Sequence, residues 1–304
     1  MKNITIHEVG LRDGLQMEKM HVPFETKAAW LQQLIDSGVD IIQIGSFVHP
    51  KYVPQMAETD ALFRQFALEK SRPDGLIYSG LVLNEKGLER GLDCGVDMFC
   101  MGVSASETHS MKNTKMTVDE ALPRIIKMAH LAEEANKSVQ VSVQSAFGCG
   151  FEGPIAVSQI ERIVHKYVDA GLKNISLADT AGHASPAQVE QLLETVLKID
   201  NSLEITCHFH NTYGLALANC FSAMKMGVTI FESAFAGLGG CPFTAVAGGN
   251  VCTEDLVHML QRTGDCTHVQ LNSLLNLAKE TARFFSREMD GKIYRTGEIT
   301  YQNK

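Results

Sequence analysis

Short apolar segments alternate along this chain with longer segments in which apolar residues recur every three or four positions. The first kind is typical of strands covered on both faces, and the second of amphipathic helices. The pattern predicts eight strands, at Ile4–Val9, Ile41–Gly45, Leu76–Leu83, Met98–Val103, Val139–Ser145, Ile175–Ala178, Ile205–Phe209 and Ile230–Ala234. The predicted helices between them include Glu25–Ser37, Val118–Asn136, Val157–Ala170, Ala187–Ile199 and Gly214–Met226.

Several of these units end on a glycine that is followed closely by the next strand. The sequences are D-S-G-V-D at 36–40, D-C-G-V-D at 93–97, D-A-G-L-K at 169–173 and K-M-G-V-T at 225–229. Glycine can adopt the left-handed conformation that ends a helix. Eight such strand–helix units in about 240 residues predict an α/β fold, a (β/α)8 TIM barrel.

The residues after the eighth strand predict further helices and no second domain. Apolar spacing favours helices at Glu254–Arg262 and Leu271–Arg287, and no low-complexity segment or Pro/Gly linker interrupts the 304 residues. We therefore expect one catalytic domain over 1–304, with the barrel at about 3–252 and a C-terminal helical extension at about 253–304.

Composition and charge narrow the function classes. The chain has 27 basic and 35 acidic residues, a net charge of −8, and no basic run or stripe, which argues against nucleic-acid or anionic-membrane binding. No apolar run approaches the roughly 20 residues that span a bilayer, and the N-terminus shows no signal-peptide pattern. The eight cysteines form no CxxC pair. We expect free thiols and a cytoplasmic location.

Barrel enzymes place their active sites at the carboxyl ends of the strands, so polar residues there are site candidates. The first strand leads into E-V-G-L-R-D-G-L-Q at 8–16, where Arg12 and Asp13 follow the apolar residues. A simple Asp-Gly turn is the alternative interpretation. The sixth strand ends in S-L-A-D-T-A-G at 176–182, and Asp179 is there either a site residue or a helix cap.

The seventh strand ends in C-H-F-H-N-T-Y-G, which contains His208 and His210. Side chains two positions apart on a strand point to the same side. A lone strand histidine is usually a buried core residue, but two imidazoles at this spacing can bind one metal ion. The pair therefore indicates a metal site at the barrel mouth.

A glycine-rich segment, A-G-L-G-G-C-P-F-T-A-V-A-G-G-N at 236–250, follows the eighth strand. Its glycines allow close approach to a ligand, and Cys241 within it is more reachable than a core cysteine. Asn250 offers an amide oxygen, or else caps the next helix, a role for which Thr253 competes. The segment matches neither the P-loop nor the dinucleotide-binding glycine pattern.

Four of these side chains together offer two oxygens and two nitrogens: Asp13, His208, His210 and Asn250. Mixed ligation with open positions fits a catalytic divalent cation and does not fit a closed structural zinc site. We expect Mg²⁺ or Mn²⁺, while Zn²⁺ and Co²⁺ also fit such ligands.

In combination, these segments resemble the HMG-CoA lyase family of metal-dependent TIM-barrel lyases. The match runs in family order from about residue 5 to residue 260, through E-V-G-L-R-D-G-L-Q, S-F-V-H-P-K-Y-V-P-Q-M, S-L-A-D-T-A-G, H-F-H-N-T-Y-G-L-A-L-A-N, G-L-G-G-C-P-F and G-N-V-C-T-E-D-L-V-H-M-L. The resemblance implies cleavage of 3-hydroxy-3-methylglutaryl-CoA (HMG-CoA) to acetoacetate and acetyl-CoA, a reaction of leucine degradation and ketone-body formation.

The resemblance also implies a role for each candidate residue. Arg12 would stabilise the enolate oxygen, and Asp179 and His208 would help remove the proton of the tertiary hydroxyl. Cys241 would help protonate the released enolate or shield the site from water. The metal ligands would be Asp13, His208, His210 and Asn250. The expected substrate contacts are Gln16, Gln43, Ser46 and Ser176.

Gln43 departs from the family pattern, because this position is normally a glutamate that pairs with the arginine after the first strand. An amide can accept a hydrogen bond from Arg12 but cannot neutralise it, so either the hydrogen bond is simply kept or the substrate or activity has changed. We expect the amide to lie inside the barrel and to bond Arg12 or a substrate oxygen.

A second departure lies at 284–292, F-F-S-R-E-M-D-G-K, a segment that helps to bind CoA in the family. Arg287 and Lys292 could serve there, but Glu288 and Asp290 bring negative charge close to where phosphates would bind. The two departures keep an alternative open, in which the same retro-aldol or retro-Claisen chemistry acts on another branched hydroxy-acid or its CoA thioester.

Two further hypotheses fit the sequence less well. Condensing barrels of the malate-synthase-like group usually begin with a T-L-R-D-G-E-Q-like motif and carry extra C-terminal domains, unlike this chain. A barrel that has lost its activity would be expected to lack one of the site residues, yet all are present. The apolar C-terminal helices favour a subunit interface, so we expect a homo-oligomer, a dimer or tetramer.

Overall fold

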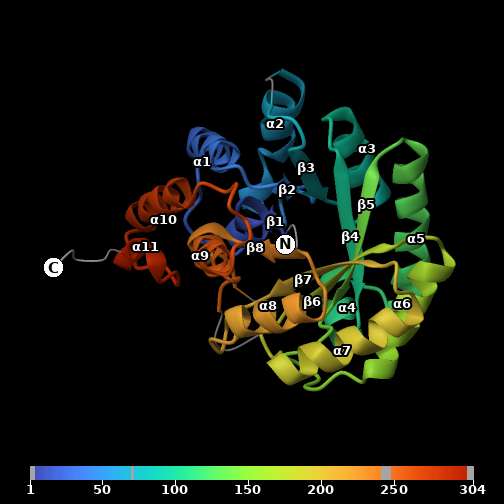
Figure 1. Cartoon of the computed structure of the whole chain (residues 1–304). Coiled ribbons are helices and arrows are strands. Elements are labelled where there is room, and N and C mark those ends of the chain that lie inside the picture. The colour runs from blue at the N-terminus through green and yellow to red at the C-terminus, as the bar shows by residue number, and fades with distance from the viewer. Residues whose placement is uncertain (1–3, 70–71, 241–247, 300–304) are drawn as a thin grey trace.

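A computed structural model describes residues 4–69, 72–240 and 248–299, and its strands form a closed barrel in sequence order (Figure 1). All strands pair in parallel, and β8 closes the ring against β1. The strands are β1 (Thr5–Glu8), β2 (Ile41–Ser46), β3 (Ile77–Leu81), β4 (Met98–Ser104), β5 (Ser138–Gln144), β6 (Asn174–Asp179), β7 (Glu204–Phe209) and β8 (Ile230–Ser233). The predicted (β/α)8 barrel and its eight strands are confirmed.

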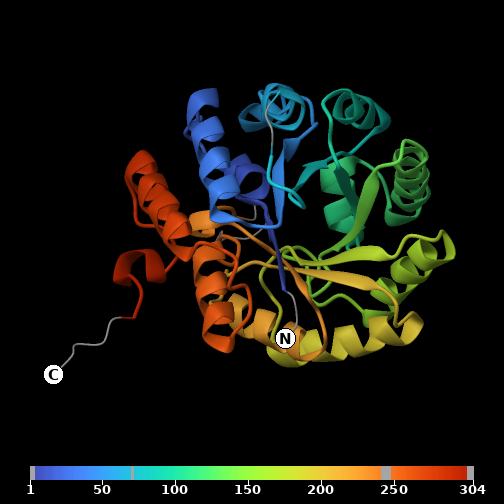
Figure 2. The ribbon, with the colours of Figure 1, turned by 45° about the horizontal axis from the view of Figure 1, so that its top comes forward.

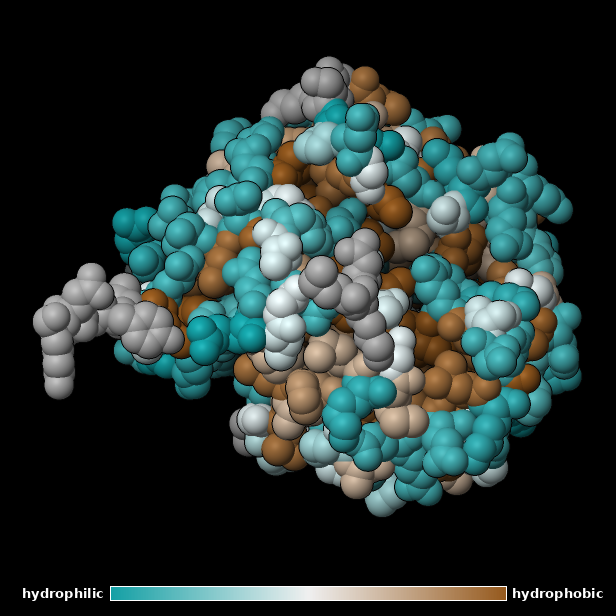
Figure 3. All heavy atoms as spheres, in the orientation of Figure 1, coloured by the Kyte–Doolittle hydropathy of each residue, from teal (hydrophilic) through white to brown (hydrophobic). Residues whose placement is uncertain are grey.

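Helices surround the barrel (Figure 2). They are α1 (Phe24–Ser37), α2 (Thr59–Phe63), α3 (Glu85–Asp93), α4 (Glu107–Thr114), α5 (Val118–Glu134), α6 (Val157–Asp169), α7 (Pro186–Ile199) and α8 (Ala216–Lys225). The inner faces are apolar, as in α6, where Ile160, Ile163 and Val164 are fully buried. On the face seen in Figure 3, most residues at the edge of the molecule are hydrophilic. The predicted glycine ends are confirmed, since Gly38, Gly95, Gly171 and Gly227 all have positive φ.

Three more helices follow the barrel: α9 (Thr253–Thr263), α10 (Leu271–Phe285) and α11 (Ile293–Thr296). Helix α10 lies beside α1 (Figure 1), and the Trp30 ring centroid is 5.4 Å from that of Phe284. The apolar residues of α10 are therefore largely buried within the chain, and the homo-oligomer stays a prediction. Within the described ranges, none of the helices combines the length and apolarity needed to cross a bilayer.

The barrel interior carries an apolar cluster and a polar layer. Ile41, Met98 and Cys100 form the apolar cluster, near the amino ends of β2 and β4. Beyond it, polar side chains bond across the barrel, as where Gln140 Nε2 donates to Thr206 Oγ1 at 3.0 Å. The short apolar runs of the sequence did not predict this polar layer, which forms the floor of the site described below.

Two buried carboxyl groups hold the segment that follows β8. Glu8 Oε1 accepts hydrogen bonds from the backbone N–H of Gly10 at 2.6 Å and of Phe235 at 3.1 Å. Glu254 Oε2 accepts one from the N–H of Ala236 at 3.0 Å. Burial raises the pKa of Glu8 to about 7 and that of Glu254 to about 8. Burial therefore shifts both groups toward the protonated form in the folded chain.

Glu254→Gln should make the stability of the protein less dependent on pH. The folded-state pKa of Glu254 lies above the usual value of 4.5, so its stabilising effect is complete below that value and is lost as pH rises through about 8. Glutamine cannot ionise. Relative to the parent protein, the free energy of unfolding of the variant should therefore rise by about 2 kcal/mol between about pH 6 and about pH 8. Urea denaturation at both pH values measures this, and parallel pH profiles would contradict it.

Candidate active site

A cavity of about 340 Å³ lies inside the barrel at the carboxyl ends of the strands. Eight of the side chains predicted from sequence line it: Arg12, Asp13, Gln16, Gln43, Ser46, Ser176, His208 and His210. They come from β1, β2, β6 and β7 or from the turns that follow these strands. The closed barrel thus brings residues that are distant in sequence to one point.

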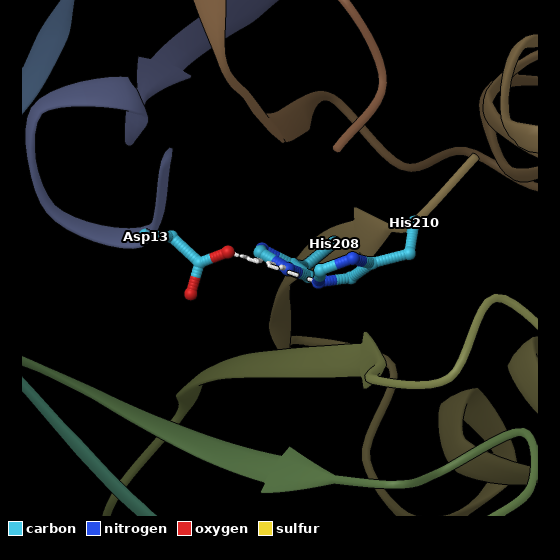
Figure 4. Close-up of side chains that lie close together, drawn as sticks. All are labelled: Asp13, His208 and His210. Carbon is cyan, nitrogen blue, oxygen red and sulfur yellow. Dashed lines mark ion pairs between the residues drawn. The ribbon is translucent and has the colours of Figure 1, made fainter. Parts of the chain in front are cut away.

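Asp13 and the two histidines form the centre of this cavity, as Figure 4 shows. Asp13 lies in a tight turn after β1 and points its carboxylate toward the imidazoles at the end of β7. Its Oδ2 is 3.7 Å from His210 Nε2 and 4.0 Å from His208 Nε2. One ligand atom from each residue lies within 4.8 Å of the other two, so a single cation can contact all three.

Asn250 completes the donor set from the segment after β8. Its Nδ2 donates to Asp13 Oδ2 at 2.8 Å and to the Leu238 carbonyl at 3.0 Å. Its Oδ1 is buried and has no hydrogen-bond partner within the described residues. A buried oxygen without a partner is costly, and a hard cation is a partner that would satisfy it. These residues therefore fit a divalent ion held by Asp13, His208, His210 and Asn250.

The alternative role of Asn250 as a helix cap is wrong. Cys252 occupies the N-cap position of α9, and its side chain makes no capping hydrogen bond. Thr253, the competing candidate, instead bonds through its hydroxyl to the carboxylate of Glu8 and lies 2.8 Å from Ser233 Oγ. Both residues thus make contacts to distant strands or turns in place of local capping bonds.

The protonation states of Asp13 and His210 suit the binding of a cation. Burial opposes ionisation of Asp13, but Arg12 and the two histidines together hold its pKa below the usual value. Burial and the neighbouring His208 lower the pKa of His210 to about 4. At neutral pH the carboxylate is therefore ionised and the His210 imidazole is neutral, the states in which both can bind a metal.

Gln43 lies inside the barrel and its amide oxygen accepts a hydrogen bond from Arg12 Nε, as predicted. Arg12 Nη1 also contacts Asp13 Oδ1 at 2.5 Å, and Gln16 Nε2 donates to that same oxygen at 2.9 Å. The guanidinium is thus held from two sides. Gln43 contributes to its orientation without neutralising its charge, which leaves Asp13 as its ionic partner.

Gln43→Glu should change kcat/KM by less than about tenfold, because the hydrogen bond to Arg12 is kept. Gln43→Leu removes the acceptor and leaves a buried Arg12 donor without its partner, so it should lower kcat/KM by about 10- to 100-fold, or about 1.4–2.7 kcal/mol. Steady-state kinetics of both variants test this pair of expectations. A large gain for the glutamate variant would show that the charge matters more than the hydrogen bond.

Asp179 ends β6 and is fully buried, but it is not among the described residues that line the cavity. Its carboxylate accepts hydrogen bonds from the backbone N–H of His183 at 2.8 Å and of Ala184 at 3.1 Å. Burial raises its pKa to about 7. Ser185 and Gln188 form the capping box of α7. Asp179 therefore holds the loop before α7, and its catalytic role stays a prediction.

The described parts of the glycine-rich segment, 236–240 and 248–250, pack closely against each other. A side chain at Gly249 would lie 1.8 Å from the Gly237 carbonyl oxygen, and Gly239 has a φ of 118°. These positions require glycine, because a Cβ at Gly249 would overlap the neighbouring backbone and the φ of Gly239 strains other residues. Cys241 lies outside the described residues, so its predicted role remains a prediction.

Two of the four charged residues in the segment 284–292 form ion pairs within the chain. Arg287 Nη2 lies 2.6 Å from Glu18 Oε1, and Glu288 Oε2 lies 2.8 Å from Arg295 Nη1. The negative charge of Glu288, which raised a concern about phosphate binding, thus has a cation beside it. Arg287, one of the two basic residues expected to help bind CoA, is already paired with Glu18.

The polar residues that the sequence did not reveal include Glu232 on β8 and His7 on β1. Glu232 lines the cavity, and its Oε2 accepts a 2.7 Å hydrogen bond from His208 Nδ1. Burial opposes its ionisation, but that bond holds its pKa at about 2. Burial lowers the pKa of His7 to about 4, so this residue is neutral. The available signal was a charged or imidazole side chain within a short apolar strand.

A closed (β/α)8 barrel with an Asp/His/His/Asn cluster at its strand ends defines a metal-dependent barrel enzyme. The HMGL-like family profile matches residues 3–280. The chain is 40% identical to hydroxymethylglutaryl-CoA lyase YngG of Bacillus subtilis over 278 residues, 91% of this chain and 92% of that protein. It is 36% identical to the human mitochondrial hydroxymethylglutaryl-CoA lyase over 292 residues, 96% and 89% of the two chains.

Solved structures agree with these relatives. The crystal structure of the B. subtilis HMG-CoA lyase matches with a TM-score of 0.92 at 37% identity, covering 97% of this chain and 98% of that one. An HMG-CoA lyase from Acinetobacter baumannii in complex with coenzyme A and 3-methylmalate also matches with a TM-score of 0.92, at 34% identity, covering 100% and 98%. The chain belongs to the HMGL-like family and is a carbon–carbon lyase.

Proposed function

We propose that this protein cleaves HMG-CoA to acetoacetate and acetyl-CoA with one bound divalent cation, Mg²⁺ or Mn²⁺. The observation that carries the proposal is the placement of Arg12 against Asp13, which in turn faces His208, His210 and Asn250. The relatives that share 36–40% of the sequence are named hydroxymethylglutaryl-CoA lyases, which supports the same substrate here.

The residues of the site offer a place for a cation, a fixed positive charge and an acceptor for a proton. A bound cation would act as a Lewis acid on the oxygens of the substrate. Arg12 offers a fixed positive charge for the enolate oxygen, since Gln43 and Asp13 hold its guanidinium in place. Asp179 is the proposed acceptor for the hydroxyl proton, since it lies between Ala178 and Thr180, which line the cavity, and burial raises its pKa to about 7, suited to a base at neutral pH. His208 would hold the cation.

The size of the cavity fits the acyl part of the substrate. At about 340 Å³ it lies at the low end of the roughly 300–1,000 Å³ of small-molecule sites. The acyl group fits inside beside neutral hydrogen-bonding groups such as Gln16, Ser46 and Ser176. The CoA portion would then extend out of the barrel mouth.

An assay of purified protein with HMG-CoA tests the proposal. We expect acetoacetate to form with Mg²⁺ or Mn²⁺, to stop on addition of EDTA and to resume when the metal is restored. A parallel panel of branched hydroxy-acids and their CoA thioesters tests the alternative substrate. Turnover of a panel member without cleavage of HMG-CoA, in protein shown to bind metal, would replace the proposed substrate.

The setting of the enzyme belongs to the same proposal. We expect a cytoplasmic homo-oligomer with small-molecule partners only, acting in leucine degradation or ketone-body formation. All seven cysteines within the described residues are buried and free, which supports a reducing compartment. Size-exclusion chromatography with light scattering measures the oligomeric state.

A further inference from the structure

A chain of buried polar side chains crosses the barrel beneath the metal cluster. Strand register sets it up: Glu232 on β8 is level with His7 on β1 and with His208 on β7. Glu232 Oε2 lies 2.7 Å from His208 Nδ1, and its Oε1 lies 3.6 Å from His7 Nδ1. His7 Nε2 lies 2.7 Å from Ser79 Oγ on β3. Four strands thus contribute to one connected set.

The contact between Glu232 and His208 fixes which imidazole nitrogen carries the proton. A carboxylate can only accept hydrogen bonds, so the hydrogen in the 2.7 Å contact sits on His208 Nδ1. The other nitrogen, Nε2, is the one that faces Asp13 Oδ2 at 4.0 Å. Turning the imidazole over would break the Glu232 bond in a site where both side chains are nearly fully buried.

The carboxylate of Glu232 is itself held in place. Ser176 Oγ donates to its Oε1 at 3.3 Å from β6. On the other side His7, fully buried and anchored by Ser79, fills the space against the same oxygen. Its Nδ1 has no hydrogen-bond partner within the described residues, and Glu232 Oε1 lies 3.6 Å from it. Glu232 therefore has little freedom to leave His208.

We propose that Glu232 is a positioning residue of the metal centre, which holds His208 in the tautomer that presents Nε2 to the cation, and that His7 holds Glu232 in turn. Carboxylates that accept from the second nitrogen of a ligand histidine fix its ring and raise its basicity. The sequence gives no sign of this role, because it depends on the lateral register of three strands. The inference rests on the proposed function only in taking the Asp13, His208, His210 and Asn250 cluster to bind a divalent cation.

Metal titration of Glu232→Gln tests the proposal without any substrate. The variant keeps the size of the side chain but loses the carboxylate, and an amide can turn to donate to His208 Nδ1 and so favour the wrong tautomer. We expect the dissociation constant for Mn²⁺, measured by calorimetry or electron paramagnetic resonance, to rise about 10- to 100-fold. His7→Leu should give a smaller rise, about three- to tenfold, because it loosens Glu232 without removing it.

Glu85→Gln is the control, since it removes the carboxylate of a glutamate at the start of α3 that pairs with Arg124 and is not among the described residues lining the cavity. Its Mn²⁺ affinity should equal that of the parent protein. If Glu232→Gln also binds Mn²⁺ as tightly as the parent, the proposal is wrong. If the parent fails to cleave HMG-CoA while Glu232→Gln still weakens Mn²⁺ binding, the proposed function fails and the positioning role stands.

Nuclear magnetic resonance of the native protein gives a test that does not depend on a variant that folds. Two-bond ¹⁵N–¹H correlation of the His208 ring distinguishes its tautomers. We expect the proton on Nδ1 in the metal-free protein and after addition of Mg²⁺. A proton on Nε2 with none on Nδ1, in either state, would overturn the proposal.

Discussion

Asp13→Asn should abolish metal binding and lower kcat of the lyase reaction by about 10³-fold or more, equivalent to about 4 kcal/mol in the barrier. The carboxylate is the only anion among the four predicted ligands, and its Oδ2 faces both histidines and the Asn250 amide. Asparagine has nearly the same shape but no charge. It would leave Arg12 without its anionic partner and the cation with neutral ligands only.

Calorimetric titration with Mn²⁺ and the acetoacetate assay measure the two parts of this expectation separately. Asp36→Asn is the matched control, because Asp36 is exposed near the end of α1 and should leave both quantities unchanged. Circular dichroism confirms that Asp13→Asn remains folded. If the variant kept its Mn²⁺ affinity within about threefold of the parent, Asp13 would not be a metal ligand.

Features that repeat locally in the sequence were predictable. The barrel follows from short apolar runs alternating with helical periodicity, and from glycines such as Gly38 and Gly171 that end helices with positive φ. The metal cluster follows from His208 and His210, two positions apart on one strand, and from Asp13 directly after another strand. Once a barrel is assumed, all strand ends meet at one face, so these residues must lie close together.

Features that depend on contacts between strands were not predictable in the same way. Glu232 reaches His208 only because β7 and β8 pair in one particular register, which no local pattern specifies. The capping interpretation of Thr253 failed because its hydroxyl bonds Glu8, far away in the sequence. Asp179 was ambiguous for another reason, since a strand-end aspartate suits both catalysis and loop support, and the structure gives it two backbone N–H donors.

Arg12→Gln should lower kcat by about 10³- to 10⁴-fold while the affinity for Mn²⁺ stays equal or becomes tighter. The rate falls because no fixed cation remains to meet the enolate charge. The metal affinity does not fall because a positive charge 2.5 Å from Asp13 Oδ1 has been removed and the four ligands are intact. The two readouts therefore move in different directions, which separates the loss of Arg12 from general damage to the site.

Exchange of the acetyl-CoA methyl hydrogens with deuterium from the solvent isolates the enolate step, because it requires no carbon–carbon bond cleavage. Parent protein loaded with Mg²⁺ should catalyse this exchange, and Arg12→Gln should not. Arg12→Lys restores the charge but not the donor that bonds Gln43, so it should recover at most about tenfold of the lost rate. If Arg12→Gln still catalyses the exchange at a rate within tenfold of the parent, another group stabilises the enolate charge. The bound cation is then the first candidate to test.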